Sequence, residues 1–410
     1  MSCSTASAAR LARLRAAYAA AGAGGMLVRG TTNIQWLTAF DGVFDEEQAH
    51  ALFVDGERAV LHTDSRYAAA CERVARAGGG EVEVDAARET HAAFAARLWG
   101  SAPDGAEAAA GSGEVAPASD GAEASAGSGN VPAPADAPAP AQRAGEQLAI
   151  EDSIALAEYR RLERAFAPGS LAETSEVVFG LRAVKDACEV ARMRAAQAVT
   201  DAAFAHVIAF MRPGMTEREV QLELEGFMLS HGASGLAFPS IVAAGANGAN
   251  PHAIPGGTVL EAGQCVVLDF GAKARGYCSD MTRTVFLGAP SGAMLDAWQT
   301  LRRANEEVEG MLRPGVTGRE AHELAERILA EGGFGGRMGH GLGHGVGLDI
   351  HEEPVLAPRN ARALEPGNVV TVEPGIYLPG EFGMRLEDFG IVTQDGFDVF
   401  TQSTHEMVVL

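Results

Sequence analysis

One stretch in the first half of the chain limits most strongly how the sequence can fold. Residues 101–145 contain no aromatic residue and almost no large aliphatic one, and consist mainly of Ala, Gly, Pro, Ser and acidic residues. Such a composition cannot bury enough apolar surface to offset the entropy cost of ordering the chain. We therefore predict a disordered acidic insertion here, with a short interaction segment as the alternative, and expect folded domains on either side of it.

The pattern predicts two domains, because a chain of 410 residues is too long for a single ordinary one. Before the insertion, apolar runs alternate with helical stretches, which is typical of a small α/β domain. The elements expected there are helices at 8–21 and 67–76 and strands at 26–28, 34–38, 51–54 and 59–63. The ordered pattern resumes at residues 147–150, and we place this first domain at residues 1–165.

The second domain is expected at residues 175–410. It opens with a strongly helical stretch at 183–210, and a second helix follows at 217–231, where Thr216 precedes Glu219 in a capping pattern. Beyond this helix, strands and Gly-rich turns are expected to dominate up to the C-terminus. This order of elements predicts the α+β class.

Composition and charge restrict the class of protein. The formal net charge of −22 argues against a nucleic-acid or anionic-membrane partner, because such surfaces need clustered Lys and Arg. A hydrophobic share of 47% fits a soluble protein, and no window has the length of an apolar membrane span. The five cysteines are scattered without a CxxC pair, which favours a reducing cytoplasmic location over a disulfide framework or a cysteine zinc site.

Two aspartates stand at the ends of expected strands. Asp269 lies in the almost wholly apolar run 264–270, and Asp280 precedes the strand-like run 281–287, with a hairpin connection at 271–276. If these strands pair antiparallel, the two carboxylates lie side by side and repel each other unless a cation sits between them. A metal ion would remove that repulsion, although a structural or solvated role for the two residues stays equally open.

A glycine-rich segment carries two histidines and precedes a third. His340 and His344 lie among the glycines of residues 339–347, and His351 follows. Glycine lets a backbone pass close to a ligand, and histidine is the commonest donor to transition metals. Three histidines in so short a segment favour a functional site over the packing role that a lone histidine would have.

Two glutamates complete the set of candidate ligands. Glu373 follows the apolar run 369–372, and Glu387 follows Arg385 and Leu386. Four carboxylates with one imidazole form a hard-to-borderline donor set that suits Mn, Co, Fe or Zn. The set has enough ligands for two ions.

From about Val184 to the C-terminus, the chain resembles the metallopeptidases of the pita-bread fold, a group that includes methionine aminopeptidases, proline aminopeptidases and prolidases. The segments that carry the resemblance, in the family's order, are 184–186, 238–241 with 245–252, 268–271, 279–283, 340–351, 371–375 and 384–388. Residues 33–38 and 62–67 are similar to the N-terminal domain of the proline-directed members, which methionine aminopeptidases lack. The resemblance implies a C-terminal pita-bread catalytic domain with a smaller creatinase-like α/β domain before it.

The resemblance also implies a role for each residue of the site. Two divalent ions are expected, manganese first and Co, Fe or Zn as alternatives, on the ligands Asp269, Asp280, His344, Glu373 and Glu387. Asp280 and Glu387 are expected to bridge the two ions. The residues expected to bind substrate are His252, His340, His351 and Arg385, and those expected to act in catalysis are Glu373, His252 and His351.

The activity implied is release of the N-terminal residue from peptides with proline in the second position, by a hydroxide that bridges two metals. Some dipeptidases of the family carry an arginine shortly after the position of His351, whereas residues 352–355 contain none here, and Arg359 and Arg362 follow. We therefore predict an aminopeptidase, with an Xaa-Pro dipeptidase as the alternative. A non-peptidase hydrolase or a peptide-binding module of the same fold is a remoter alternative. The proline-directed members are commonly dimers, which implies a homodimer.

Overall fold

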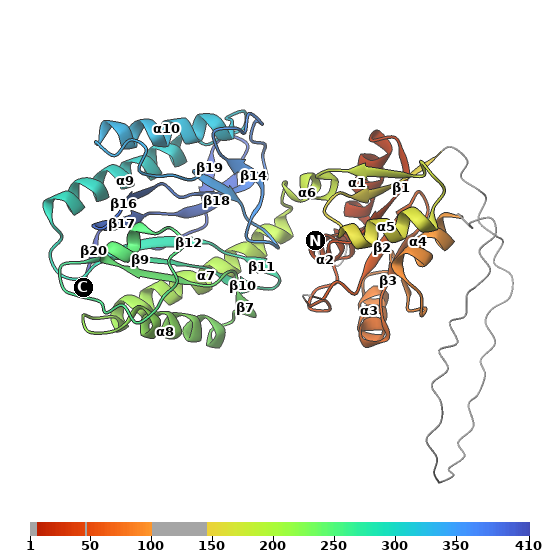
Figure 1. The fold of residues 1–410 in the computed structure, drawn as a ribbon, viewed down its shortest axis with the longest axis horizontal. Coiled ribbons are helices and arrows are strands. Elements are labelled where there is room, and N and C mark those ends of the chain that lie inside the picture. The colour runs from red at the N-terminus through yellow and green to blue at the C-terminus, as the bar shows by residue number, and fades with distance from the viewer. Residues whose placement is uncertain (1–5, 46, 101–145) are drawn as a thin grey trace, which may run out of the picture.

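The computed structural model describes residues 6–45, 47–100 and 146–410, and the insertion predicted at 101–145 lies outside them. Figure 1 shows two bodies side by side, connected through α6 (Val177–Arg182) and α7 (Ala187–Phe210). None of the helices in this described part of the chain has the length and apolar character of a membrane span.

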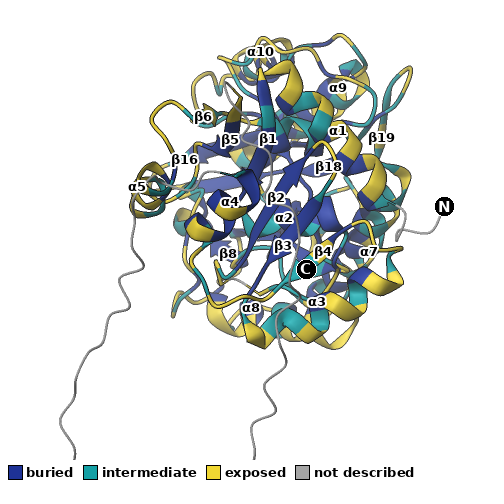
Figure 2. Ribbon diagram, turned by 90° about the vertical axis from the view of Figure 1, so that its right-hand side faces the viewer, coloured by how far each residue is buried: buried dark blue, intermediate teal, exposed yellow. Residues whose placement is uncertain are grey.

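The N-terminal body is built on a six-stranded sheet with the order β4-β3-β2-β1-β5-β6. Its strands are β1 (Ala23–Val28), β2 (Ala51–Asp55), β3 (Ala59–His62), β4 (Glu83–Asp85), β5 (Gln147–Glu151) and β6 (Leu171–Thr174). The helices around it are α1 (Ala6–Ala20), α2 (Thr31–Thr38), α3 (Ser65–Ala77), α4 (His91–Trp99) and α5 (Leu156–Ala165). In Figure 2 the central strands are buried and the helices turn exposed faces outward, so the core lies between sheet and helices.

The strand predicted at 34–38 is wrong, because these residues belong to the helix α2. A short apolar run cannot distinguish a strand from a buried helical turn, and the tertiary contacts decide. Asn33 and Trp36, three residues apart on one helix face, both reach buried carboxylates: Asn33 Nδ2 donates to Glu151 (2.6 Å) and Trp36 Nε1 donates to Glu189 (2.9 Å).

The C-terminal body places sheets between two pairs of helices (Figure 1). One pair is α7 with α8 (Glu217–Ser230), and the other is α9 (Gly292–Met311) with α10 (Gly318–Glu331). The four-stranded sheet has the order β20-β12-β9-β8, from β8 (Ile241–Ala244), β9 (Cys265–Phe270), β12 (Met281–Phe286) and β20 (Val408–Val409). The five-stranded sheet has the order β14-β13-β15-β18-β19, from β13 (Gly343–Gly345), β14 (Glu352–Leu356), β15 (Val369–Val372), β18 (Asp388–Val392) and β19 (Phe397–Val399).

The smaller strands complete this body. β16 (Gly375–Leu378) and β17 (Phe382–Arg385) form an antiparallel hairpin. A three-stranded sheet joins β7 (Gly235–Leu236), β10 (Ala272–Ala274) and β11 (Tyr277–Cys278). A 3-10 helix, η2, spans Gly245–Ala249.

The expectation that strands and turns dominate beyond residue 231 is wrong for residues 292–331, which form α9 and α10. The helical signals are present in the sequence. Trp298, Leu301 and Val308 recur at helical spacing and are buried, and Thr317 with Glu320 forms a capping box at the start of α10.

Buried ion pairs hold the segment that connects the two bodies against the C-terminal body. Glu352 on β14 lies between Arg182 and Lys185, and Lys185 Nζ is 2.8 Å from the Glu352 carboxylate. Burial alone would raise the pKa of Glu352, but these two cations lower it to about 2.

Cys188 at the start of α7 is disulfide-bonded, which the scattered cysteines did not predict.

Candidate metal centre and active site

The two aspartates are placed by adjacent antiparallel strands. β9 pairs with β12 in the register Phe270 to Met281 and Asp269 to Thr282, so Asp280 at the start of β12 lies beside the end of β9. The expected antiparallel pairing is therefore confirmed. Both side chains are buried, at 8% exposed for Asp269 and 4% for Asp280, where the repulsion between two carboxylates is felt most strongly.

His344 comes from β13, which lies between β14 and β15. Its Nδ1 is 3.0 Å from the carbonyl oxygen of Gly345, and a carbonyl can only accept, so this nitrogen carries the proton. The other nitrogen, Nε2, keeps its lone pair and lies 3.6 Å from an Asp280 oxygen and 3.4 Å from a Glu373 oxygen. Burial lowers the pKa of His344, which keeps the ring neutral and suited to a metal.

The two glutamates come from neighbouring segments of the same sheet. Glu373 follows β15, and Glu387 precedes β18. Glu387 faces Thr282 across an isolated bridge, and Thr282 Oγ1 donates to a Glu387 oxygen at 2.6 Å. The fold thus brings together residues that are far apart in the sequence, because the contact between Thr282 and Glu387 spans 105 positions.

Three carboxylates of the site, those of Asp280, Glu373 and Glu387, are destabilised as anions in the folded chain. Burial raises the pKa of Asp280 well above its usual value, and the charges of Asp269 and Glu373 raise it further. Burial, and then the charge of Asp280, raise the pKa of Glu387 well above its usual value. Burial also raises the pKa of Glu373. Four carboxylates face one buried guanidinium, that of Arg385, so the cluster has a deficit of positive charge.

The residues fit a divalent cation. Atoms of Asp280, His344 and Glu387 lie within 4.8 Å of one another, as ligands of a common ion would. Asp269 Oδ1 is buried and has no hydrogen-bond partner, although the other oxygen pairs with Arg385. A buried carboxylate oxygen without a partner is costly, and a metal ion would satisfy it.

Without metal, the chain is expected to lose stability as pH rises. The folded-state pKa values of Asp280, Glu373 and Glu387 lie above their usual values, so the folded chain binds more protons than the unfolded one above the ordinary carboxyl range of about 4. The Tm of metal-free protein should fall by several degrees between about pH 5 and pH 8. Protein loaded with Mn²⁺ should show a much smaller fall, and equal slopes in thermal melts would contradict this account.

Gly343→Ala is expected to weaken metal binding by at least about 10-fold. A Cβ at Gly343 would lie 2.1 Å from the Thr371 carbonyl oxygen, so β13 would have to shift and carry His344 with it. Calorimetric titration of metal-free protein with Mn²⁺ measures the effect. Gly292→Ala is the matched control, because a Cβ there meets nothing within 4 Å. Unchanged affinity in Gly343→Ala would show that β13 does not set the ligand.

One cavity of about 1010 Å³ gathers the predicted residues. All nine line it, namely His252, Asp269, Asp280, His340, His344, His351, Glu373, Arg385 and Glu387. His252 and His351 are exposed, and the rings of His351 and His344 meet edge to face with 4.3 Å between their centroids. Aromatic and aliphatic side chains such as Phe238, Ile350 and Val355 line the same cavity.

Sequence reasoning missed Tyr377 on β16. Its hydroxyl accepts from Arg385 Nη1 (2.7 Å) and lies 3.0 Å from His340 Nε2. His340 Nδ1 faces the Gly341 carbonyl oxygen at 2.6 Å, so Nδ1 carries the proton and Nε2 accepts from Tyr377. Tyr377 therefore connects a predicted substrate-binding histidine to the arginine that holds Asp269. Its position close to Glu373 was the one sequence signal for it.

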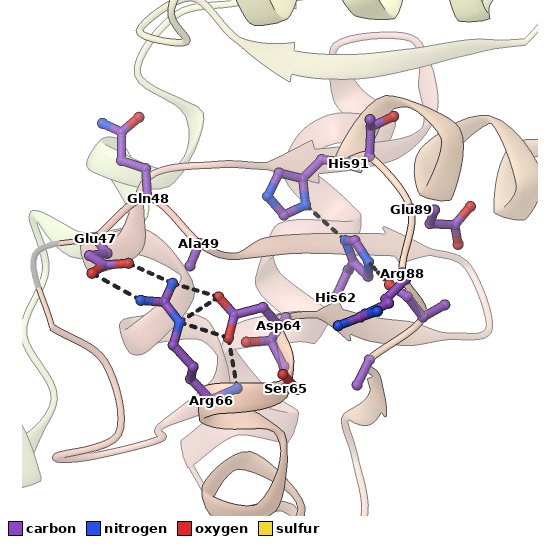
Figure 3. A pocket seen from close by; sticks show the side chains of 14 residues that line it. Glu47, Gln48, Ala49, His62, Asp64, Ser65, Arg66, Arg88, Glu89 and His91 are labelled. Carbon is purple, nitrogen blue, oxygen red and sulfur yellow. Dashed lines mark hydrogen bonds and ion pairs between the residues drawn. The ribbon is translucent and has the colours of Figure 1, made fainter. Parts of the chain in front are cut away.

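A second cavity, of about 950 Å³, lies in the N-terminal body and is shown in Figure 3. Its charged groups largely satisfy one another, because Arg66 pairs with Glu47 and Asp64. His62 contacts His91 (2.8 Å between the Nδ1 atoms). His62 also lies near Asp85 and Glu89, but Arg97 pairs with both carboxylates. None of the nine predicted site residues lines this cavity.

Comparison with known proteins gives a consistent family. The model of metallopeptidase family M24 matches residues 191–394, and the model of the creatinase/prolidase N-terminal domain matches residues 10–184. The uncharacterized peptidase YqhT of Bacillus subtilis is 32% identical over 407 residues, which cover 98% of this chain and 100% of that protein.

Two solved structures cover almost the whole chain as well. An Xaa-Pro dipeptidase from Bacillus anthracis superimposes with a TM-score of 0.82 at 33% identity, over 98% of this chain and 100% of that one. An X-Pro aminopeptidase from Thermotoga maritima MSB8 does so with a TM-score of 0.76 at 27% identity, over 96% and 100%. The α+β class, with a C-terminal pita-bread domain and an N-terminal creatinase-like domain, is thereby confirmed. The chain is a hydrolase and belongs to metallopeptidase family M24.

Proposed function

We propose that this protein is a two-metal exopeptidase that releases the N-terminal residue from peptides with proline in the second position. The observation that carries the proposal is the convergence of four carboxylates and one imidazole in a cavity that also presents His252, His340 and His351. The names Xaa-Pro dipeptidase and X-Pro aminopeptidase, borne by similar proteins, support proline specificity.

Asp269, Asp280, His344, Glu373 and Glu387 would hold the metal ions, and Asp280 and Glu387 would be the two ligands common to both. Manganese is proposed first, with Co, Fe or Zn as alternatives, because this donor set does not discriminate among them. When bound, such ions lower the pKa of water toward about 7 and polarise the scissile carbonyl group.

The chain's own residues would move the proton and stabilise charge. Glu373 accepts the proton of the attacking water and passes it to the leaving nitrogen, as a carboxylate next to the nucleophile can. His252 and His351 donate hydrogen bonds to the carbonyl oxygen as negative charge develops on it. Partial loss of contact with solvent lowers the pKa of His351, which favours the neutral ring with one N–H to donate.

Selectivity for proline follows from what the cavity wall offers. A proline amide has no N–H, and its ring is apolar and compact. Phe238, Ile350 and Val355 line the cavity close in sequence to the site residues and supply apolar contact for such a ring.

Two features of the cavity support the aminopeptidase as the first candidate. Val355 stands four residues after His351 and lines the cavity, and Arg359 and Arg362 beyond it are exposed and do not line it. The cavity has a volume of about 1010 Å³, slightly above the roughly 300 to 1,000 Å³ usual for ligand pockets, and a peptide longer than two residues needs a large cavity.

An Xaa-Pro dipeptidase is the second candidate. Arg218 and Arg337 line the same cavity, and either guanidinium could pair with the C-terminal carboxylate of a dipeptide. The B. anthracis structure, which is similar over nearly the full chain, also carries the name Xaa-Pro dipeptidase.

The test is a substrate series on Mn²⁺-loaded protein, with kcat/KM and released products followed for Ala-Pro-Ala-Ala, Ala-Pro and Ala-Ala-Ala-Ala. Release of alanine from the proline tetrapeptide, with little cleavage of the all-alanine one, supports the aminopeptidase. Cleavage of Ala-Pro alone identifies the dipeptidase. Equal cleavage of both tetrapeptides would overturn proline specificity.

A further inference from the structure

Arg283 is a buried arginine next to the proposed metal ligand Glu387, and it uses its whole hydrogen-bonding capacity there. Arg283 on β12 is 2% exposed, and each of its five N–H groups has an acceptor. Nη1 donates to the carbonyl oxygens of Thr282 (3.0 Å) and Glu387 (2.6 Å). Nη2 donates to Asp388 and to the Ser403 carbonyl oxygen (2.7 Å each), and Nε donates to that of Thr404 (3.0 Å).

These contacts fix the segment that carries a proposed bridging ligand. Arg283 holds the backbone carbonyl of Glu387 itself and that of Thr282. Thr282 in turn holds the Glu387 carboxylate through Oγ1 (2.6 Å), and the Glu387 N–H donates to the Thr282 carbonyl oxygen (3.1 Å). The Arg283 guanidinium thus holds the backbone of both residues, Thr282 and Glu387, whose contact orients this ligand.

The same arginine connects the site to the C-terminal segment 403–405. Asp388, which is fully buried, accepts from Arg283 with one oxygen and contacts His405 Nε2 with the other (2.7 Å). Glu309, Asp388 and His405 lie close enough together to hold an ion, but Arg283 already supplies the positive charge at Asp388. The cluster is therefore better described as a neutralised buried ion-pair network than as another metal site.

We propose that Arg283 is a positioning residue for the metal centre, which holds the Glu387 and Thr282 backbones in the geometry that metal binding needs and couples that geometry to the segment 403–405. The inference rests on the metal ligands assigned under the proposed function. Groups that orient a metal ligand without touching the metal change its affinity by about 10- to 100-fold when removed. Lysine cannot replace the arginine fully, because an ammonium group offers three donors and lacks the planar fork.

The test is calorimetric titration of metal-free protein with Mn²⁺, together with the Tm of the metal-free protein. Arg283→Lys is expected to weaken the affinity about 10-fold and Arg283→Met up to about 100-fold. Arg194→Met is the matched control, since Arg194 pairs with Asp398 on the surface of the same body. This replacement is expected to leave the Mn²⁺ affinity unchanged. His405→Gln should cost only a few-fold, because it keeps a donor for Asp388.

The outcomes separate this role from a merely structural one. If Arg283→Lys lowers the Tm but binds Mn²⁺ as tightly as the wild type, Arg283 only stabilises the fold and the inference is overturned. Should Arg283→Met fail to fold, Arg283→Lys and His405→Gln still decide. The titration needs no substrate, so a wild type that binds Mn²⁺ but cleaves no proline peptide would overturn the proposed function and leave the inference standing.

Discussion

Replacement of Glu373 by glutamine should lower kcat for Ala-Pro-Ala-Ala by at least about 10³-fold. The glutamine amide cannot accept the proton of the attacking water. The replacement also removes one negative charge from the proposed metal ligands. Glu373 is well placed for both roles, because its carboxylate lines the cavity and lies 3.4 Å from His344 Nε2. Steady-state rates at saturating peptide give kcat, and the metal content of the variant separates loss of the base from loss of the ion.

The matched control is Glu381→Gln, an exposed glutamate in the turn between β16 and β17 that does not line the cavity. It should keep the wild-type kcat. A Glu373→Gln variant that holds its full metal complement and retains more than about a tenth of kcat would exclude Glu373 as the general base.

Asp280→Asn should abolish turnover, lowering kcat/KM by at least about 10³-fold, and at the same time make the metal-free protein more stable. Asparagine removes one of four crowded carboxylates. Burial first, and then the charges of Asp269 and Glu373, raise the pKa of Asp280 well above its usual value. The metal-free Tm at pH 8 should therefore rise by about 2 to 4 °C, while the increase in Tm on addition of Mn²⁺ should shrink.

Opposite signs in stability and activity are the diagnostic feature of this variant. If Asp280 had only a packing role, its replacement would lower both the stability and the activity of the protein, because a buried polar group would be left without a partner. Asp296→Asn, at an exposed position on α9, controls for the loss of one charge and should change neither property. A lower metal-free Tm in Asp280→Asn would contradict the proposed crowding of charge.

Most residues of the proposed site stand next to strong local signals in the sequence. Asp269 lies in an apolar strand, Asp280 starts one, Glu373 ends one, and His344 lies in a run of glycines. Each of these signals indicates the position of the residue within its own strand or loop. All nine residues predicted from these signals and from the resemblance line one cavity.

What the sequence could not show is how distant elements meet. The contact between Arg385 and Asp269 spans 116 positions, and that between Thr282 and Glu387 spans 105. The roles of Tyr377 and Arg283 depend on such contacts, because neither residue stands out in its own segment. The helix α2 was missed for a related reason, since Asn33 and Trp36 are held by carboxylates more than 100 positions away.

The helices α9 and α10 were missed although their signals are local. Buried apolar residues at helical spacing and the capping pair Thr317 and Glu320 were available in the sequence. The Gly-rich turns on either side drew the prediction toward strands and loops. The error left the site unaffected, because these helices cover the outside of the sheets (Figure 1).

The most direct test of the central claim is a titration of metal-free protein with Mn²⁺ while release of alanine from Ala-Pro-Ala-Ala is followed. We expect no turnover without metal and a rise in rate that saturates near two ions per chain. Turnover that persists in fully metal-free protein would contradict the assignment of Asp269, Asp280, His344, Glu373 and Glu387 as a catalytic metal centre.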